Sequence, residues 1–132
     1  MTDEMENAKQ LLDKSEYIRR LGIEILELSE DTAKGRMPFD AKKSNPGGAI
    51  HGGCLFSLAD TIAGTLSFHR AGKYTVTVEG SLHFLSAAVD TTYVYCLAKM
   101  KRFGKTLVTV DVDITDDNGK LLDCGCFTYY RI

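Results

Sequence analysis

The stretch that decides the fold runs from residue 44 to residue 69, SNPGGAIHGGCLFSLADTIAGTLSFH. It contains one formal charge, Asp60, whereas 26% of the whole chain is charged. Its first part is rich in glycine, which favours a loop, and the remainder is small or apolar at almost every helical position. We therefore expect a central, buried helix over residues 53–69. A lone carboxylate in such a helix is costly unless it is paired or has a chemical role.

The composition limits the kind of protein. A length of 132 residues with 44% hydrophobic residues predicts one domain, 1–132, with a single core. A net charge of -2 argues against nucleic acid as a partner. No run reaches the roughly 18 apolar residues of a membrane span, and the acidic start is unlike a signal peptide, so we expect a cytoplasmic protein without membrane contact. The four cysteines lack zinc-site spacing, which predicts reduced thiols and no metal.

The chain before the central stretch predicts a helix and a hairpin. Residues 3–20 carry a helical stripe of apolar residues among charges, so the segment 1–21 is expected to form an amphipathic N-terminal helix. Residues 22–29 and 32–40 then predict two short strands joined by a tight turn.

The chain after the central stretch changes to a period of two residues, which predicts long strands. These segments are residues 75–85, 91–101, 105–115 and 121–132. In the first of them, the alternation places Val76, Val78, Leu82 and Phe84 on one face. An antiparallel sheet of this size needs a cover for its apolar face, and the central helix is the best candidate. We expect an α+β fold in which the sheet wraps around that helix.

The loop before the central helix suits an oxyanion. His51 and Gly52 lead into the helix, where backbone N–H groups have no intrahelical partner and lie at the positive end of the dipole. Glycine lets a ligand approach these groups closely. An oxyanion of the kind that forms in acyl transfer would fit there.

The spacing between Gly52 and Asp60 predicts a shared site. The two residues are eight positions apart, which is ~12 Å along a helix at ~1.5 Å per residue. A reacting carbonyl must lie about 3 Å from its oxyanion donors and close to the activating carboxylate. One chain cannot place both groups on one reaction centre, but two antiparallel helices of a symmetric dimer can. If this is an active site, we expect it to be shared between two subunits.

Residues 45–64, NPGGAIHGGCLFSLADTIAG, resemble the signature of hotdog-fold acyl-CoA thioesterases of the PaaI type, and the resemblance extends from about Ile23 to the C-terminus. It implies a hotdog fold, a homodimer or homotetramer, and hydrolysis of an acyl-CoA with no cofactor. By position, Asp60 matches the general base or nucleophile. Gly52 matches the residue whose N–H polarises the thioester carbonyl, and His51 supports that loop.

The same matching implies further contacts. Asn45 matches the side chain that holds the water or the thioester, and Thr77 replaces a serine that positions water in some relatives. Segments 84–88 and 102–107 match regions that contact coenzyme A. The implied substrate contacts are Gly53, Phe84, Leu85, Ser86, Arg102, Gly104 and Lys105. The basic turn at Arg102 and Lys105 suits phosphate groups, although a solvated hairpin end explains it equally well.

Other functions stay open. A non-catalytic acyl-CoA-binding or regulatory module on the same fold would bind the ligand without turnover. A hotdog dehydratase is disfavoured because no helical histidine has a matching acidic partner. Asp60 as a structural cap is also an alternative, although the central stretch offers it no local partner. A phosphate-binding loop at residues 104–106 is excluded because Lys99 stands where that motif requires glycine.

Overall fold

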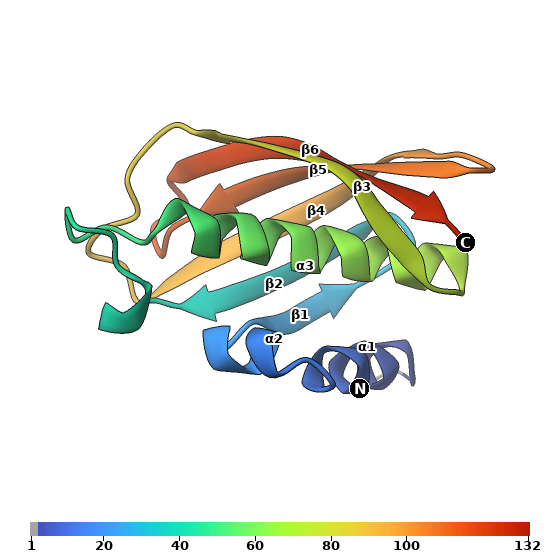
Figure 1. Cartoon of the computed structure of the whole chain (residues 1–132), viewed down its shortest axis with the longest axis horizontal. Helices are drawn as coiled ribbons and strands as arrows, with labels where there is room; N and C mark the ends of the chain where they lie inside the picture. The colour runs from blue at the N-terminus through green and yellow to red at the C-terminus, as the bar shows by residue number, and fades with distance from the viewer. Residues whose placement is uncertain (1–2) are drawn as a thin grey trace.

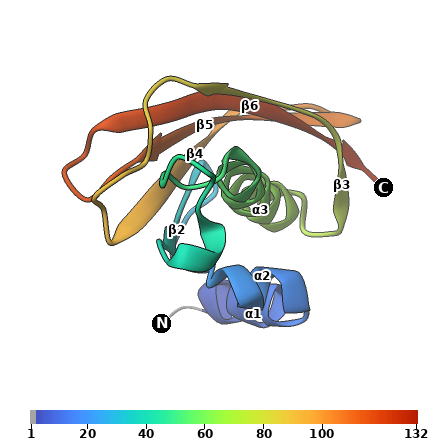
Figure 2. The same ribbon diagram turned by 60° about the vertical axis from the view of Figure 1, so that its left-hand side comes forward.

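Six strands and four helical segments make up the computed structural model, which describes residues 3–132. In chain order they are α1 (Asp3–Asp13), α2 (Glu16–Leu21), β1 (Glu24–Leu28), β2 (Thr32–Pro38), the 3-10 helix η1 (Ala41–Lys43), α3 (Gly52–Ala71), β3 (Thr75–Phe84), β4 (Tyr93–Phe103), β5 (Leu107–Thr115) and β6 (Leu121–Arg131). The strands pair antiparallel in the order β1-β2-β4-β5-β6-β3. The sheet curves around α3, and α1 and α2 lie beside that helix (Figures 1 and 2). The expected hotdog arrangement is confirmed.

The central helix α3 packs one face against the sheet. It begins one residue earlier than expected and ends at Ala71, and the Gly72 cap that follows has a φ of 70°, the left-handed conformation that glycine favours after a helix end. Its buried side chains are Leu55, Leu58, Ala59, Ile62, Ala63, Thr65, Leu66 and Ser67. The sheet supplies the other half of the core from Val108, Val110, Val112 and Ile114, which share one face of β5 as expected.

The first turns of α3 are only partly covered by their own chain. Phe56 is 36% exposed although its ring packs against Phe127 at 5.0 Å between centroids, and Gly53 is exposed as well. The expectation of a helix buried on every side is therefore wrong for a single copy of the chain.

The N-terminal segment forms two helices where one was expected. Helix α1 ends at Asp13, and Ser15 starts α2 by accepting a hydrogen bond from the Ile18 backbone N–H at 3.2 Å. Serine is a favoured N-cap residue, which explains why a second helix starts after Ser15. Residues 1 and 2 of the expected helix lie outside the described residues. None of the helices within residues 3–132 combines the length and the apolar content needed to cross a membrane.

A bulge in β3 changes which side chains face α3. The pairing with β6 shifts its register between Thr77 and Glu79, so Val78 is an extra residue on the β3 side. An extra residue reverses the alternation of side chains along a strand. The expectation that Val76 and Val78 share a face with Leu82 is therefore wrong, and Val76 and Val78 are 40% and 54% exposed. Because of this reversal, Thr77 is the residue that faces the helix.

Candidate active site

Asp60 lies in the middle of α3 and accepts hydrogen bonds from two hydroxyl groups. The Thr77 hydroxyl on β3 donates to Asp60 Oδ1 at 2.9 Å, and the Tyr129 hydroxyl on β6 lies 2.9 Å from the same oxygen. Tyr129 also lies 3.0 Å from the Asp60 backbone carbonyl oxygen. Within residues 3–132, Oδ2 of Asp60 has no hydrogen-bond or ion-pair partner. The carboxylate therefore has one occupied oxygen and one free oxygen.

Tyr129 is the donor that the sequence did not reveal. Its side chain is only 2% exposed. Burial, followed by the neighbouring Asp60 carboxylate, raises the pKa of Tyr129, so the phenol keeps its proton and acts as a donor. The alternation of β6 indicates a buried tyrosine at this position, and a buried phenol needs a hydrogen-bond partner. Its partner Asp60 is 69 residues away in the chain, so no local sequence pattern could indicate that the two residues meet.

The start of α3 holds the second half of the expected site. The His51 Nδ1 accepts a hydrogen bond from the Gly53 backbone N–H at 2.8 Å, and the His51 carbonyl accepts from Cys54 N at 2.9 Å. Within the described chain, the Gly52 N–H has no acceptor. His51 therefore accepts the hydrogen bonds of the Gly53 and Cys54 N–H groups, while the Gly52 N–H is left available to an oxyanion.

Asn45 organises the loop before α3. Its Oδ1 accepts hydrogen bonds from Gly47 N at 2.9 Å and from Ala49 N at 3.1 Å. These contacts use the amide oxygen, so the side-chain NH₂ is the group that remains for a ligand. A pocket of about 340 Å³ brings Asn45 together with Gly52 and with Phe84, Leu85 and Ser86.

A different pocket, of about 620 Å³, contains Asp60 and Thr77 together with Tyr129. It lies between α3 and the N-terminal helices, and we call it the Asp60 pocket. Its apolar walls are Leu11, Leu12, Ile18, Phe68 and Tyr74. Gly52 and Asp60 therefore line separate pockets of one chain.

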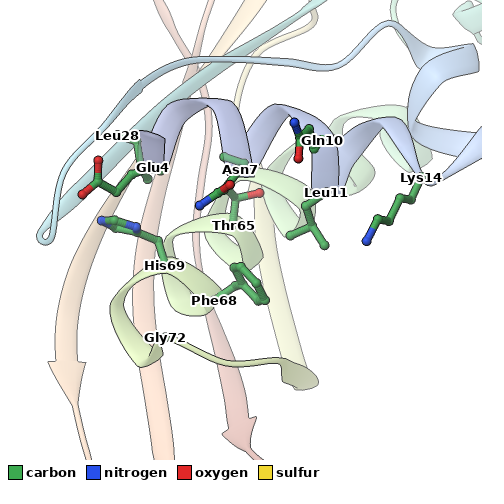
Figure 3. A pocket seen from close by; sticks show the side chains of 11 residues that line it. Glu4, Asn7, Gln10, Leu11, Lys14, Leu28, Thr65, Phe68, His69 and Gly72 are labelled. Atoms are coloured by element: carbon green, nitrogen blue, oxygen red, sulfur yellow. The ribbon is translucent and has the colours of Figure 1, made fainter. Parts of the chain in front are cut away.

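A neighbouring hollow of about 400 Å³ lies between α1 and the last turns of α3 (Figure 3). It shares Leu11, Lys14, Thr65 and Phe68 with the Asp60 pocket. Most of its other side chains are polar, and they include Glu4, Asn7, Gln10 and His69. The mixed wall that the two pockets share thus leads to a more polar hollow.

The basic turn lies at the far end of the molecule from the start of α3. Arg131 donates to the Gly104 carbonyl at 2.9 Å, and the Arg70 guanidinium lies 4.8 Å from the Phe103 ring centroid. Arg70 is in the last turn of α3, which is ~27 Å from Gly52 at ~1.5 Å per residue. Arg102 and Lys105 on this turn are exposed. One chain does not bring them together with Phe84, Leu85 and Ser86.

The described chain presents an unpartnered carboxylate oxygen at Asp60 and a backbone N–H without an acceptor at Gly52. A carboxylate that acts as base or nucleophile and an N–H that binds an oxyanion are the groups that acyl transfer to water requires. Residues 3–132 contain no group of three or more histidine, cysteine or acidic side chains placed to hold a metal ion.

Known proteins resemble this chain over most of its length. The sequence profile of the thioesterase superfamily matches residues 47–122. A Haemophilus influenzae protein is 32% identical over 120 residues, which are 89% of this chain and 85% of that protein. The acyl-coenzyme A thioesterase PaaI of Escherichia coli is 28% identical over 115 residues, or 87% of this chain and 81% of PaaI. The solved structure of E. coli PaaI has a TM-score of 0.91 at 26% identity and covers 98% of this chain and 93% of PaaI.

Proposed function

The chain belongs to the thioesterase superfamily, and on that premise we propose that it hydrolyses an acyl-CoA to a free acid and coenzyme A. The observation that carries the proposal is the free Oδ2 of Asp60 beside a pocket large enough for an acyl group. The resemblance to E. coli acyl-coenzyme A thioesterase PaaI supports coenzyme A as the thiol.

The chemistry can be written from these groups. Asp60 takes a proton from a water molecule while the water oxygen bonds to the thioester carbon. The Gly52 N–H donates to the carbonyl oxygen as negative charge develops there. The C–S bond then breaks, the proton on Asp60 passes to the departing thiolate, and the acid leaves. A direct attack by Asp60 would form an anhydride that water then opens, and it needs the same two groups.

We propose that the two groups come from different subunits of a homodimer. The ~12 Å between Gly52 and Asp60 along α3 supports this arrangement. Exposed apolar side chains on β3, which is an edge of the sheet, support pairing with a second copy. They are Val76, Val78 and Phe84. The same assembly would let Arg102 and Lys105 of one copy approach coenzyme A bound at the other, and a homotetramer extends this proposal.

We propose that the acyl group occupies the Asp60 pocket. Leu11, Ile18 and Phe68 give it an apolar wall. The polar side chains of the neighbouring hollow, together with Lys14 that lines both pockets, favour acyl groups of short or medium length, because a long alkyl chain would place apolar carbons against them (Figure 3). Four unpaired cysteines support a reducing compartment such as the cytoplasm.

A thiol-release assay tests the function. Wild-type protein and the Asp60→Asn variant are compared on acyl-CoA substrates from acetyl to palmitoyl and on a phenylacyl-CoA. We expect wild-type turnover and a loss of at least about a hundredfold in the variant. Equal rates in the two proteins would contradict the mechanism. Binding of acyl-CoA by equilibrium dialysis without any thiol release would favour the non-catalytic binding module.

A further inference from the structure

The two oxygens of Asp60 are in different environments. Oδ1 accepts from Thr77 and from Tyr129, each at 2.9 Å, whereas Oδ2 has no partner within residues 3–132. We propose that Tyr129 is a positioning residue that holds Oδ1 and leaves Oδ2 as the oxygen that acts on the substrate. This inference rests on the proposed thioester hydrolysis and adds a residue to it.

The position of Tyr129 suits this role. Strand β6 lies between β5 and β3, so its backbone is paired on both sides. The ring is buried, and the hydroxyl lies within 3.0 Å of both the side chain and the backbone carbonyl of Asp60. A Cβ atom added at Gly64, one turn after Asp60, would lie 3.5 Å from the Tyr129 ring. The ring therefore packs directly against the helix backbone, which fixes the hydroxyl relative to Asp60.

Thr77 and Tyr129 hold the carboxylate from two neighbouring strands. Thr77 reaches Asp60 from the edge strand β3, where the bulge at Val78 sets its direction. Tyr129 reaches the same oxygen from the interior of the sheet. Two donors on one oxygen restrict rotation of the carboxylate. Oδ2 is then held free for a water molecule or for the thioester carbon.

Tyr129→Phe tests the role because it removes the hydroxyl and keeps the buried ring. We expect kcat to fall by about tenfold to a hundredfold, the effect of one hydrogen bond to a charged group, with KM changed by less than about threefold. Tyr130→Phe is the matched control, since Tyr130 is the next residue on β6 and is 44% exposed.

Tyr130→Phe should keep the wild-type kcat and KM. A Tyr129→Phe enzyme with wild-type kcat would overturn the proposal, and so would a variant in which only KM changes. Thr77→Val provides a second variant in case Tyr129→Phe does not fold. It should also lower kcat with little change in KM, and a wild-type kcat there would count against two donors on Oδ1.

A measurement without substrate separates this inference from the proposed function. The ¹³C NMR signal of the Asp60 carboxyl carbon is recorded in wild-type, Tyr129→Phe and Tyr130→Phe protein, with Asp60→Asn used to assign the signal. A chemical shift that changes in Tyr129→Phe and not in Tyr130→Phe supports the contact even if no acyl-CoA is hydrolysed. An unchanged chemical shift in Tyr129→Phe overturns the contact even if the wild-type protein is an active thioesterase.

Discussion

Gly52 and Asp60 belong to the same helix, yet they line different pockets. The first has a backbone N–H without an acceptor in the described chain, and the second has a carboxylate oxygen without a partner there. In the proposed mechanism each chain carries two incomplete halves of an acyl-transfer site. We propose that the halves become complementary when the start of one α3 helix meets the middle of another.

Gly52→Pro should remove the oxyanion donor while keeping the helix. Proline is tolerated at the first helical position, and His51, with φ -61° and ψ 134°, already has the extended conformation favoured before proline. We expect a loss of about a hundredfold to a thousandfold in kcat, as for one oxyanion donor. The assay is thiol release, with circular dichroism as the check on folding.

Gly52→Ala is the matched control for the proline variant. Its new Cβ would lie 3.1 Å from the Phe84 ring, so both variants disturb that ring, but alanine keeps the N–H. Alanine should therefore retain much more activity than proline. Equal losses in the two variants would show that the amide is not the donor.

Gly64→Ala should change the preferred acyl group and stabilise the fold. Gly64 lines the Asp60 pocket, and a Cβ there would lie 3.5 Å from Tyr129, an ordinary contact. Alanine in place of a helical glycine stabilises by up to ~1 kcal/mol, so the melting temperature should rise. The ratio of kcat/KM for octanoyl-CoA to that for acetyl-CoA should fall, because the pocket narrows. A ratio that stays the same would indicate that the acyl group lies elsewhere.

Asp123 should make the stability of the fold fall as pH rises. Its side chain on β6 is 1% exposed, and neither carboxyl oxygen has a hydrogen-bond partner in the described chain. Burial raises the pKa of Asp123 from 3.8 to about 6. Well below pH 3.8 the group is protonated in both states. From about pH 3 to pH 6 the unfolded chain loses the proton first, so stability falls by at most ~3 kcal/mol and is then nearly constant.

Urea unfolding of wild-type and Asp123→Asn protein at pH 4, 5, 6 and 7 measures this effect. The difference in unfolding free energy between the two proteins isolates Asp123 from the other carboxylates. We expect the unfolding free energy of Asp123→Asn to increase relative to that of the wild type as pH rises to 6, with little further increase above it. Unfolding free energies that change in parallel with pH in the two proteins would contradict a raised pKa of Asp123.

The sequence predicted the architecture because its signals are local. Periodicity in residues 105–115 placed Val108, Val110, Val112 and Ile114 on one face, and the structure confirms it. The bulge at Val78 had no such signal, because its position depends on pairing with β6. The same limit hid the contact between Tyr129 and Asp60, which joins elements far apart in the chain.

Mixing two inactive variants tests the central claim, a site shared between subunits, most directly. Asp60→Asn and Gly52→Pro proteins are exchanged into mixed dimers, and thiol release is measured after exchange is verified by mass spectrometry. A heterodimer has one site with both groups intact if the groups come from different chains. When equal amounts of the two variants exchange subunits freely, about half of the dimers are heterodimers, and each of these has one intact site of two. The mixture should therefore recover about a quarter of the wild-type activity. Verified heterodimers with no activity above that of the two parents would contradict the shared site.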